Sequence, residues 1–173
     1  SGARPDVQRL LAFCRVHPAD GVCAPQAENP TLTLARRIRV AATPELAPWV
    51  ATSGDDRALP AVRAVFLIAP AMVQAFAPEE LGKVPSPVSI IVGAGDTVAA
   101  PATNSEVAAA ALPNARLTTL PAVGHYDFLS SCTALGKTRV GALCQLAADQ
   151  NATHGAAITE ARALFDAALS ATR

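Results

Sequence analysis

The sequence predicts an α/β fold in which parallel strands alternate with helices. Residues 61–70 and 87–93 are two nearly continuous apolar runs, which are typical of strands buried on both faces of a parallel sheet. Residues 115–120 form a third run that is more polar, so we expect it nearer an edge of the sheet. One helical pattern separates the second run from the third, and another follows the third. This alternation indicates a doubly wound parallel sheet.

The first 60 residues predict short helices and loops with little sheet. Residues 5–16 carry apolar positions at the i, i+3, i+4, i+7 spacing of a helix, namely Val7, Leu10, Leu11 and Cys14. His17-Pro18 ends this helix because a residue before proline leaves the helical region. We expect an irregular loop over 18–31, a short helix over 32–40 and a proline-containing connector over 41–60.

Two helices are expected after residue 61. Thr103-Asn104-Ser105-Glu106 fits a capping box, in which the threonine hydroxyl and the glutamate carboxylate satisfy free backbone N–H groups at a helix start. Pro113 ends that helix. Residues 156–169 predict the last helix, with one apolar stripe formed by Ile158, Ala161, Leu164, Phe165, Ala168 and Leu169.

Composition excludes several classes of protein. The chain has 173 residues, 14 basic and 14 acidic side chains, and 51% apolar residues. This length suits one domain with a sizeable core, and the apolar content argues against disorder. A formal net charge of zero gives no basic excess to neutralise the phosphates of a nucleic acid. No run of 18 apolar residues occurs, so we expect no membrane span.

The four cysteines favour disulfide bonds over a metal site. None belongs to a CxxC motif, and no histidine stands at zinc-ligand spacing from them, so we expect no metal. Their order suggests two local pairs, Cys14 with Cys23 and Cys132 with Cys144; four buried free thiols are the alternative. Disulfides favour a periplasmic or secreted location, whereas free thiols leave a cytoplasmic one open.

Two candidate catalytic residues follow neighbouring strands. Asp96 comes directly after the run at 87–93, and His125 follows the run at 115–120. Because the carboxyl ends of parallel strands meet at one edge of a sheet, we expect the two side chains to lie close together. The aspartate then orients the imidazole, whose other nitrogen is free to act as a general base. Glycines before both residues are expected to allow tight turns.

Each of these residues also has a structural interpretation. An Asp after Gly is usually a turn residue, and a lone His is usually structural; their joint placement is what favours catalysis. For Asp127 we expect a turn or an ion pair. Trp49 and Phe76 are candidates for lining an acyl pocket, although ordinary packing is favoured for both.

Residues 61–169 resemble the C-terminal half of an α/β-hydrolase, most closely the dienelactone-hydrolase-like and platelet-activating-factor-acetylhydrolase-like proteins. The segments that carry the resemblance are 95–104 (GDTVAAPATN) and 124–129 (GHYDFL). The resemblance implies that Asp96 is the triad acid and His125 the triad base, with no cofactor. It also implies that 1–60 contains the end of the helix after the nucleophile plus a cap-like insertion, and that 61–173 is the C-terminal half of the domain.

The sequence departs from this family at the nucleophile. The triad serine belongs in a G-x-S-x-G elbow upstream of the acid, and no such motif occurs; Ser53-Gly54 lacks the preceding glycine and strand. Ser1 is disfavoured as an N-terminal nucleophile because Pro5 and a helix follow it. We therefore expect the serine and the oxyanion hole upstream of this chain.

Two functions follow from this incomplete set of residues. The first is serine-type hydrolysis of a small ester, completed by an N-terminal half or a second chain that covers the strand at 61–70. The second is a catalytically incomplete α/β-hydrolase-like protein that acts as a binding or oligomerising module. The open apolar edge of that strand needs a covering partner in either case.

Overall fold

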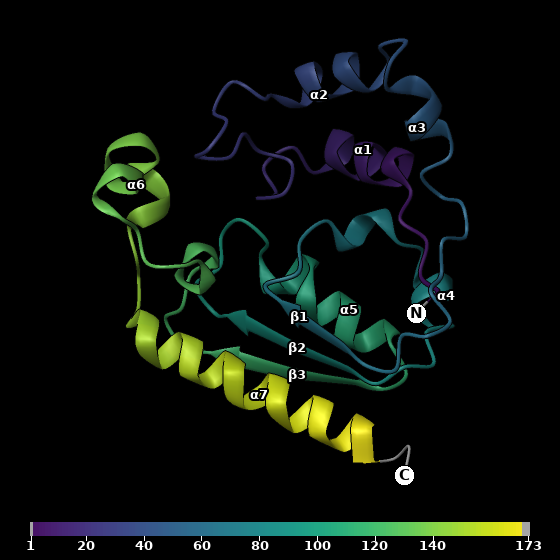
Figure 1. Ribbon diagram of the computed structural model, residues 1–173. Coiled ribbons are helices and arrows are strands. Elements are labelled where there is room, and N and C mark those ends of the chain that lie inside the picture. The colour runs from purple at the N-terminus through teal and green to yellow at the C-terminus, as the bar shows by residue number, and fades with distance from the viewer. Residues whose placement is uncertain (1, 171–173) are drawn as a thin grey trace.

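The computed structural model describes residues 2–170, so Ser1 and residues 171–173 lie outside the described part of the chain. Its centre is a three-stranded parallel sheet of β1 (Val65–Ile68), β2 (Val88–Gly93) and β3 (Ala115–Leu120), in the order β1-β2-β3 (Figure 1). Val65 pairs with Val88, which in turn pairs with Ala115. The predicted α/β class with a parallel sheet is therefore confirmed.

Helices cover both faces of the sheet. α5 (Ser105–Ala111) packs on one face, and α7 (Gln150–Ser170) runs across the opposite face (Figure 1). All six residues of β2 are buried, as a strand covered on both faces requires. Side chains alternate along a strand, so Val88 and Ile90 join the apolar cluster that includes α5 and α4 (Pro78–Leu81).

The first 60 residues contain helices, and no strand occurs in their described part. α1 (Val7–Val16), α2 (Leu34–Ala41) and α3 (Ala47–Ala51) lie together at the top of Figure 1. The sequence missed α3, a five-residue helix too short to show a periodic pattern. The Asp6 N–H donates to the Ala75 carbonyl (2.8 Å), which ties the start of α1 to η1 (Val73–Ala75).

The expected strand at 61–70 is shorter and less buried than predicted. Only Val65–Ile68 is extended, and Ile68 is 46% exposed. The physical reason is position: β1 pairs only with β2, so one long side of it has no neighbouring strand in the described chain. An apolar groove of about 450 Å³ follows this strand on the α5 side of the sheet.

The predicted capping box at Thr103 is wrong. Pro101–Thr103 forms a 3-10 turn (η2), and Asn104 occupies the cap position of α5 without a side-chain cap hydrogen bond. The Asn104 amide instead donates to the Ala100 carbonyl (3.2 Å). Pro101 fixes the backbone into the extra turn, which shifts the helix start past the threonine.

The last helix is longer than predicted, and its apolar stripe is divided. α7 begins at Gln150 rather than 156. Ala161 and Leu164 are partly buried, whereas Ile158 and Phe165 are 59% and 43% exposed. Alanine-rich helices carry apolar residues on more than one side, so the pattern alone could not show which side packs.

Several short elements complete the carboxyl end of the sheet. These are η3 (His125–Phe128), α6 (Ala134–Arg139) and η4 (Gly141–Cys144). Both local disulfides are formed: Cys14–Cys23 joins α1 to the following loop, and Cys132–Cys144 closes the loop that contains α6.

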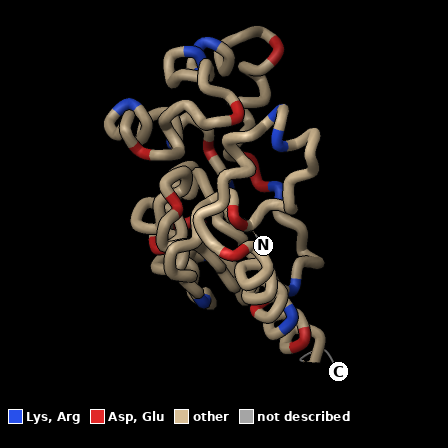
Figure 2. Tube along the Cα trace, turned by 90° about the vertical axis from the view of Figure 1, so that its left-hand side faces the viewer, with Lys and Arg blue, Asp and Glu red and all other residues tan. Residues whose placement is uncertain are grey.

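The described surface has mixed charge. Lys and Arg are interspersed with Asp and Glu over residues 2–170 (Figure 2). None of the helices in this range is both long and apolar enough to cross a membrane.

Candidate active site

Asp96 is a buried carboxylate directly after β2. Its side chain is 0% exposed. Its Oδ1 accepts hydrogen bonds from the backbone N–H groups of Val98 (2.9 Å) and Ala99 (2.7 Å). These two bonds fix the plane of the carboxylate and leave Oδ2 available for another partner. An aspartate that accepts from the residue two positions on is a common turn device, so this part of the interaction is local.

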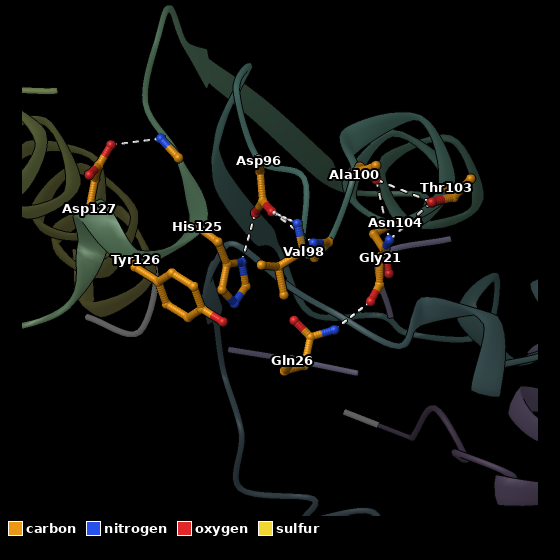
Figure 3. A network of polar contacts seen from close by, with 12 residues as sticks. Gly21, Gln26, Asp96, Val98, Ala100, Thr103, Asn104, His125, Tyr126 and Asp127 are labelled. Atoms are coloured by element: carbon orange, nitrogen blue, oxygen red, sulfur yellow. Dashed lines mark hydrogen bonds and ion pairs between the residues drawn. The ribbon is translucent and has the colours of Figure 1, made fainter. Parts of the chain in front are cut away.

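His125 provides that partner. Its Nδ1 lies 2.7 Å from Asp96 Oδ2, and its side chain is 23% exposed (Figure 3). A proton on Nδ1 that is held by the carboxylate leaves Nε2 as the unprotonated nitrogen of the neutral ring. Among residues 2–170, no group makes a hydrogen bond to His125 Nε2. The structure thus brings together the two residues that the sequence singled out.

The two loops approach each other closely. A Cβ built on Gly93 would lie 2.5 Å from the Val123 carbonyl carbon, so only glycine fits at this position. The Val123 carbonyl oxygen accepts a hydrogen bond from the Gly95 N–H (2.9 Å). This contact joins the end of β2 to the residues just before His125, and it places the aspartate and histidine within reach of one another.

The tight turn before His125 uses an alanine rather than a glycine. Ala122 has φ = 58°, in the left-handed region, whereas none of the glycines in the described chain has a positive φ. The expectation that glycines supply the turns through their backbone freedom is therefore wrong. Gly93 is needed for close approach, and the strained conformation falls on Ala122, three residues before the histidine.

A cavity of about 470 Å³ opens beside His125 at the carboxyl end of β1. Apolar side chains form most of its wall, and Glu28 is its acidic member; the lining residues are Glu28, Ile68, Ala69, His125, Tyr126, Phe128, Leu129 and Leu143. Its volume lies in the range of small-molecule sites. Ile68 and Ala69 belong to the open edge of the sheet, so the cavity adjoins the side of β1 that has no neighbouring strand.

A tyrosine links this cavity to the first part of the chain. The Tyr126 hydroxyl donates to Glu28 Oε2 (2.9 Å), and the Tyr126 ring packs edge-on against the His125 ring. Burial, followed by the hydrogen bond and the negative charge of Glu28, raises the pKa of Tyr126 to about 12. A phenol held neutral in this way is a stable hydrogen-bond donor at ordinary pH.

The loop between α1 and α2 also supports the aspartate. A Cβ on Gly21 would lie 2.8 Å from the Val98 carbonyl carbon, so the backbones of the two loops are in direct contact. The Gln26 amide donates to the Gly21 carbonyl (Figure 3). Cys23, two residues after Gly21, is held by the buried disulfide to Cys14.

Asp127 is a polar residue whose full role the sequence did not reveal. It is 1% exposed, and both carboxylate oxygens accept backbone hydrogen bonds: Oδ2 from Gly124 (2.7 Å) and Oδ1 from Ala147 (2.8 Å). The expected turn role is therefore present, and the second bond spans twenty residues. The Gly-His-x-Asp spacing was the only sequence signal for the first bond, and none existed for the second.

Other sequence candidates lie elsewhere. Trp49 is 67% exposed and lines a separate groove among α1, α2 and α3, and Phe76 lines the apolar groove beside β1. Neither lines the His125 cavity. Ser53 accepts from the Val7 N–H and donates to the Val50 carbonyl, so its hydroxyl is engaged in structure.

No serine, threonine or cysteine among residues 2–170 hydrogen-bonds to the histidine. The only hydrogen bond to His125 from a side chain of residues 2–170 is that of Asp96. Residues 2–170 also contain no group of three or more His, Cys, Asp or Glu placed to hold a metal ion. The arrangement thus holds an oriented imidazole at the edge of an apolar cavity, which is suited to proton transfer.

Comparisons with known proteins return distant structural similarities. No protein-family model matches the chain, and no curated protein matches it. Among solved structures, a predicted CIB-like hydrolase of Thermoplasma acidophilum is 17% identical with a TM-score of 0.37. The match covers 80% of this chain and 60% of that one. The 2-hydroxy-6-oxo-6-phenylhexa-2,4-dienoate hydrolase of Rhodococcus sp. strain RHA1 is 23% identical with a TM-score of 0.31, and the match covers 79% of this chain and 48% of that one.

A bromoperoxidase of Bacillus anthracis is 18% identical with a TM-score of 0.33, and the match covers 92% of this chain and 44% of that one. The match therefore spans about half the length of these three solved structures.

Proposed function

We propose that this chain is the acid–base half of a serine-type carboxylic ester hydrolase, with its serine and oxyanion hole supplied from outside residues 1–173. The observation that carries the proposal is the 2.7 Å contact between Asp96 Oδ2 and His125 Nδ1, made from the carboxyl ends of adjacent parallel strands. Ligands and catalytic groups in open parallel sheets gather at that edge. The free Nε2 beside an apolar cavity supports a role in activating a nucleophile.

The proposed reaction has two stages. His125 Nε2 takes the proton from the serine hydroxyl as its oxygen attacks the ester carbonyl carbon, and Asp96 stabilises the resulting imidazolium. The same proton passes to the alcohol oxygen as the carbon–oxygen bond breaks, which leaves an acyl-enzyme. A water molecule then attacks the acyl carbon with His125 again as base, and the acid leaves as serine regains its proton.

The cavity favours a small, largely apolar ester. Ile68, Phe128, Leu129 and Leu143 supply apolar contacts, and the cavity volume is about 470 Å³. The position of the cavity at the open edge of β1 also supports a nucleophile that arrives on a neighbouring strand. In this proposal residues 1–60 are a helical cap-like segment, and 61–173 are the C-terminal half of an α/β-hydrolase domain of the dienelactone-hydrolase-like group.

The two disulfides support a periplasmic or secreted location for the protein, because such bonds persist in oxidising compartments. Cys14–Cys23 braces the loop that contacts Val98, and Cys132–Cys144 closes the loop that carries Leu143.

Labelling with a fluorophosphonate probe tests the function. The probe should label a serine in the full-length protein that contains this chain, and it should not label residues 1–173 alone. In the full-length protein, Asp96→Asn should lower ester hydrolysis by about 10⁴-fold, because the imidazole then loses its correct tautomer. Asp149→Asn is the matched control, since that exposed carboxylate only accepts from the Asn151 N–H at the start of α7. Labelling of the isolated chain at any serine would overturn the proposal.

The exposed edge of β1 favours a second candidate function, an oligomerising or binding module without catalysis. Ile68 is 46% exposed on this strand, and edge strands pair readily with other chains. A pair of copies joined at β1 predicts a dimer mass in light scattering, which Ile68→Lys would reduce to that of a monomer. Leu135→Lys on α6 (60% exposed) is the matched control. A monomeric wild-type chain would count against this function.

A further inference from the structure

Asp127 connects two parts of the candidate site that are distant in sequence. Its Oδ2 accepts from the N–H of Gly124, the residue directly before His125, and its Oδ1 accepts from the N–H of Ala147. Hydrogen bonds from backbone N–H groups to a buried carboxylate are charge-assisted and stronger than neutral ones. One side chain therefore restrains both the turn that presents His125 and the far end of the following loop.

That following loop, residues 129–147, forms part of the cavity wall. It contributes Leu129 and Leu143 to the lining, and the Cys132–Cys144 disulfide closes it. Its first residue is held as well: the Leu129 carbonyl accepts from Gln150 Nε2 (2.6 Å) and His154 Nε2 (3.0 Å) on α7. The loop is thus fixed at its start by α7 and at its end by Asp127.

Packing alone does not explain a carboxylate at this position. Asp127 is 1% exposed, and its partners are two backbone amides rather than a cation. Removing a charged acceptor from water is costly unless its hydrogen bonds are well made. Both oxygens of Asp127 are used, and each bond acts on a segment that touches the cavity.

We propose that Asp127 is a positioning residue that fixes the orientation of His125 and the position of the 129–147 loop together. It does not touch the reacting atoms. Through Gly124 it holds the histidine so that Nδ1 faces Asp96, and through Ala147 it holds the wall that carries Leu143. This proposal rests on the proposed function for the meaning of His125 as a base, although the coupling itself is a structural property of the chain.

The test uses the Nδ1 proton of His125, which is observable by NMR when a carboxylate holds it. In the full 173-residue chain, Asp127→Asn places an amide NH₂ group against one of the two backbone N–H groups, so one bond is lost. We expect the His125 Nδ1 proton to exchange with water at least about tenfold faster than in the wild type, which corresponds to a tenfold change in an opening equilibrium. Asp149→Asn, the same substitution on an exposed aspartate, should leave this rate unchanged.

A merely structural role predicts a different result. Leu112→Ala removes a buried side chain of the α5 cluster and destabilises the fold away from the site. A variant that only lowers stability should keep the slow Nδ1 exchange in its native state, as we expect of Leu112→Ala. If Asp127→Asn also keeps the wild-type rate within about twofold while its unfolding temperature falls, the positioning role is refuted.

Wild-type hydrogen exchange keeps the proposal testable if Asp127→Asn does not fold. The amide protons of Gly124 and Ala147 should be protected and should open together with the His125 Nδ1 proton, with one shared opening free energy. An unprotected Ala147 amide would show that the link to the 129–147 loop does not exist. Neither measurement depends on ester hydrolysis, so failure of the proposed function would be distinguishable from failure of this inference.

Discussion

Gly93→Ala is the perturbation that most directly tests how the two loops of the site are held. Gly93 ends β2, and its backbone conformation lies outside the left-handed region, so alanine adds no strain of that kind. The added Cβ would lie 2.5 Å from the carbonyl carbon and 2.9 Å from the Cβ of Val123. The substitution therefore acts through close approach alone.

The size of the effect follows from these distances. Carbon atoms in contact normally lie about 3.5–4.0 Å apart, so the Val123 segment must move by about 1 Å. His125 is two residues further along the same segment. If the segment moves as a unit and away from Asp96, the 2.7 Å contact lengthens to as much as about 3.7 Å, which is beyond the range of a hydrogen bond. Overpacking of this kind costs about 1–3 kcal/mol of the free energy of unfolding.

Two measurements check this prediction. Urea unfolding should show the loss of stability, and NMR should show a weakened or rapidly exchanging Nδ1 proton of His125. Gly155→Ala is the control, because nothing lies within 4 Å of its added Cβ and alanine is favoured inside α7 by about 1 kcal/mol. If Gly93→Ala matched Gly155→Ala in stability and kept the wild-type Nδ1 signal, the close contact would not position the site.

Three further predictions concern the surroundings of the site. Replacing both Cys14 and Cys23 by alanine opens a loop of about ten residues and should lower the free energy of unfolding in urea by about 3 kcal/mol; an unchanged value would show that the bond constrains little. Tyr126 is the only tyrosine, so its ionisation can be read from tyrosinate absorbance: we expect a pKa of about 12 in the wild type and a lower value in Glu28→Gln. The folded-state pKa of Tyr126 lies above the value of about 10 that is usual for a tyrosine. The stabilising contribution is therefore complete below about pH 10 and is lost as the pH rises through about 12, and Tyr126→Phe should flatten that fall in denaturation curves. Ala122→Gly relieves a positive φ and should raise the unfolding temperature, with a gain of about 0.5–1 kcal/mol; a loss of stability would contradict strain at this turn.

The sequence predicted the sheet and the central pair of the site. The apolar run at 87–93 identified the buried strand, because a strand covered on both faces has no alternation. Parallel topology then required the residues after adjacent strands to meet, which is why Asp96 and His125 were found although they are 29 positions apart in the sequence.

Contacts between loops could not be predicted from the sequence. Glu28 and Tyr126 are 98 positions apart, and no periodic pattern relates them. The bond from Ala147 to Asp127 has the same character, since it joins two irregular segments. The predicted capping box at Thr103 was wrong for a different reason. The local sequence preference favoured a cap there, but the 3-10 turn that follows Ala100 moved the start of the helix.

The positions of the two disulfides give the connector at 54–61 a special role, because no covalent cross-link spans it. Both disulfides are local, with separations of 9 and 12 positions, so neither joins the first 60 residues to the sheet. The connector at 54–61 is exposed throughout. A protease that cut there would produce two fragments, each retaining its own disulfide, held together by Asp6 with Ala75, Glu28 with Tyr126, and Gly21 against Val98. Dissociation of such a nicked protein on dilution would measure the strength of that interface directly.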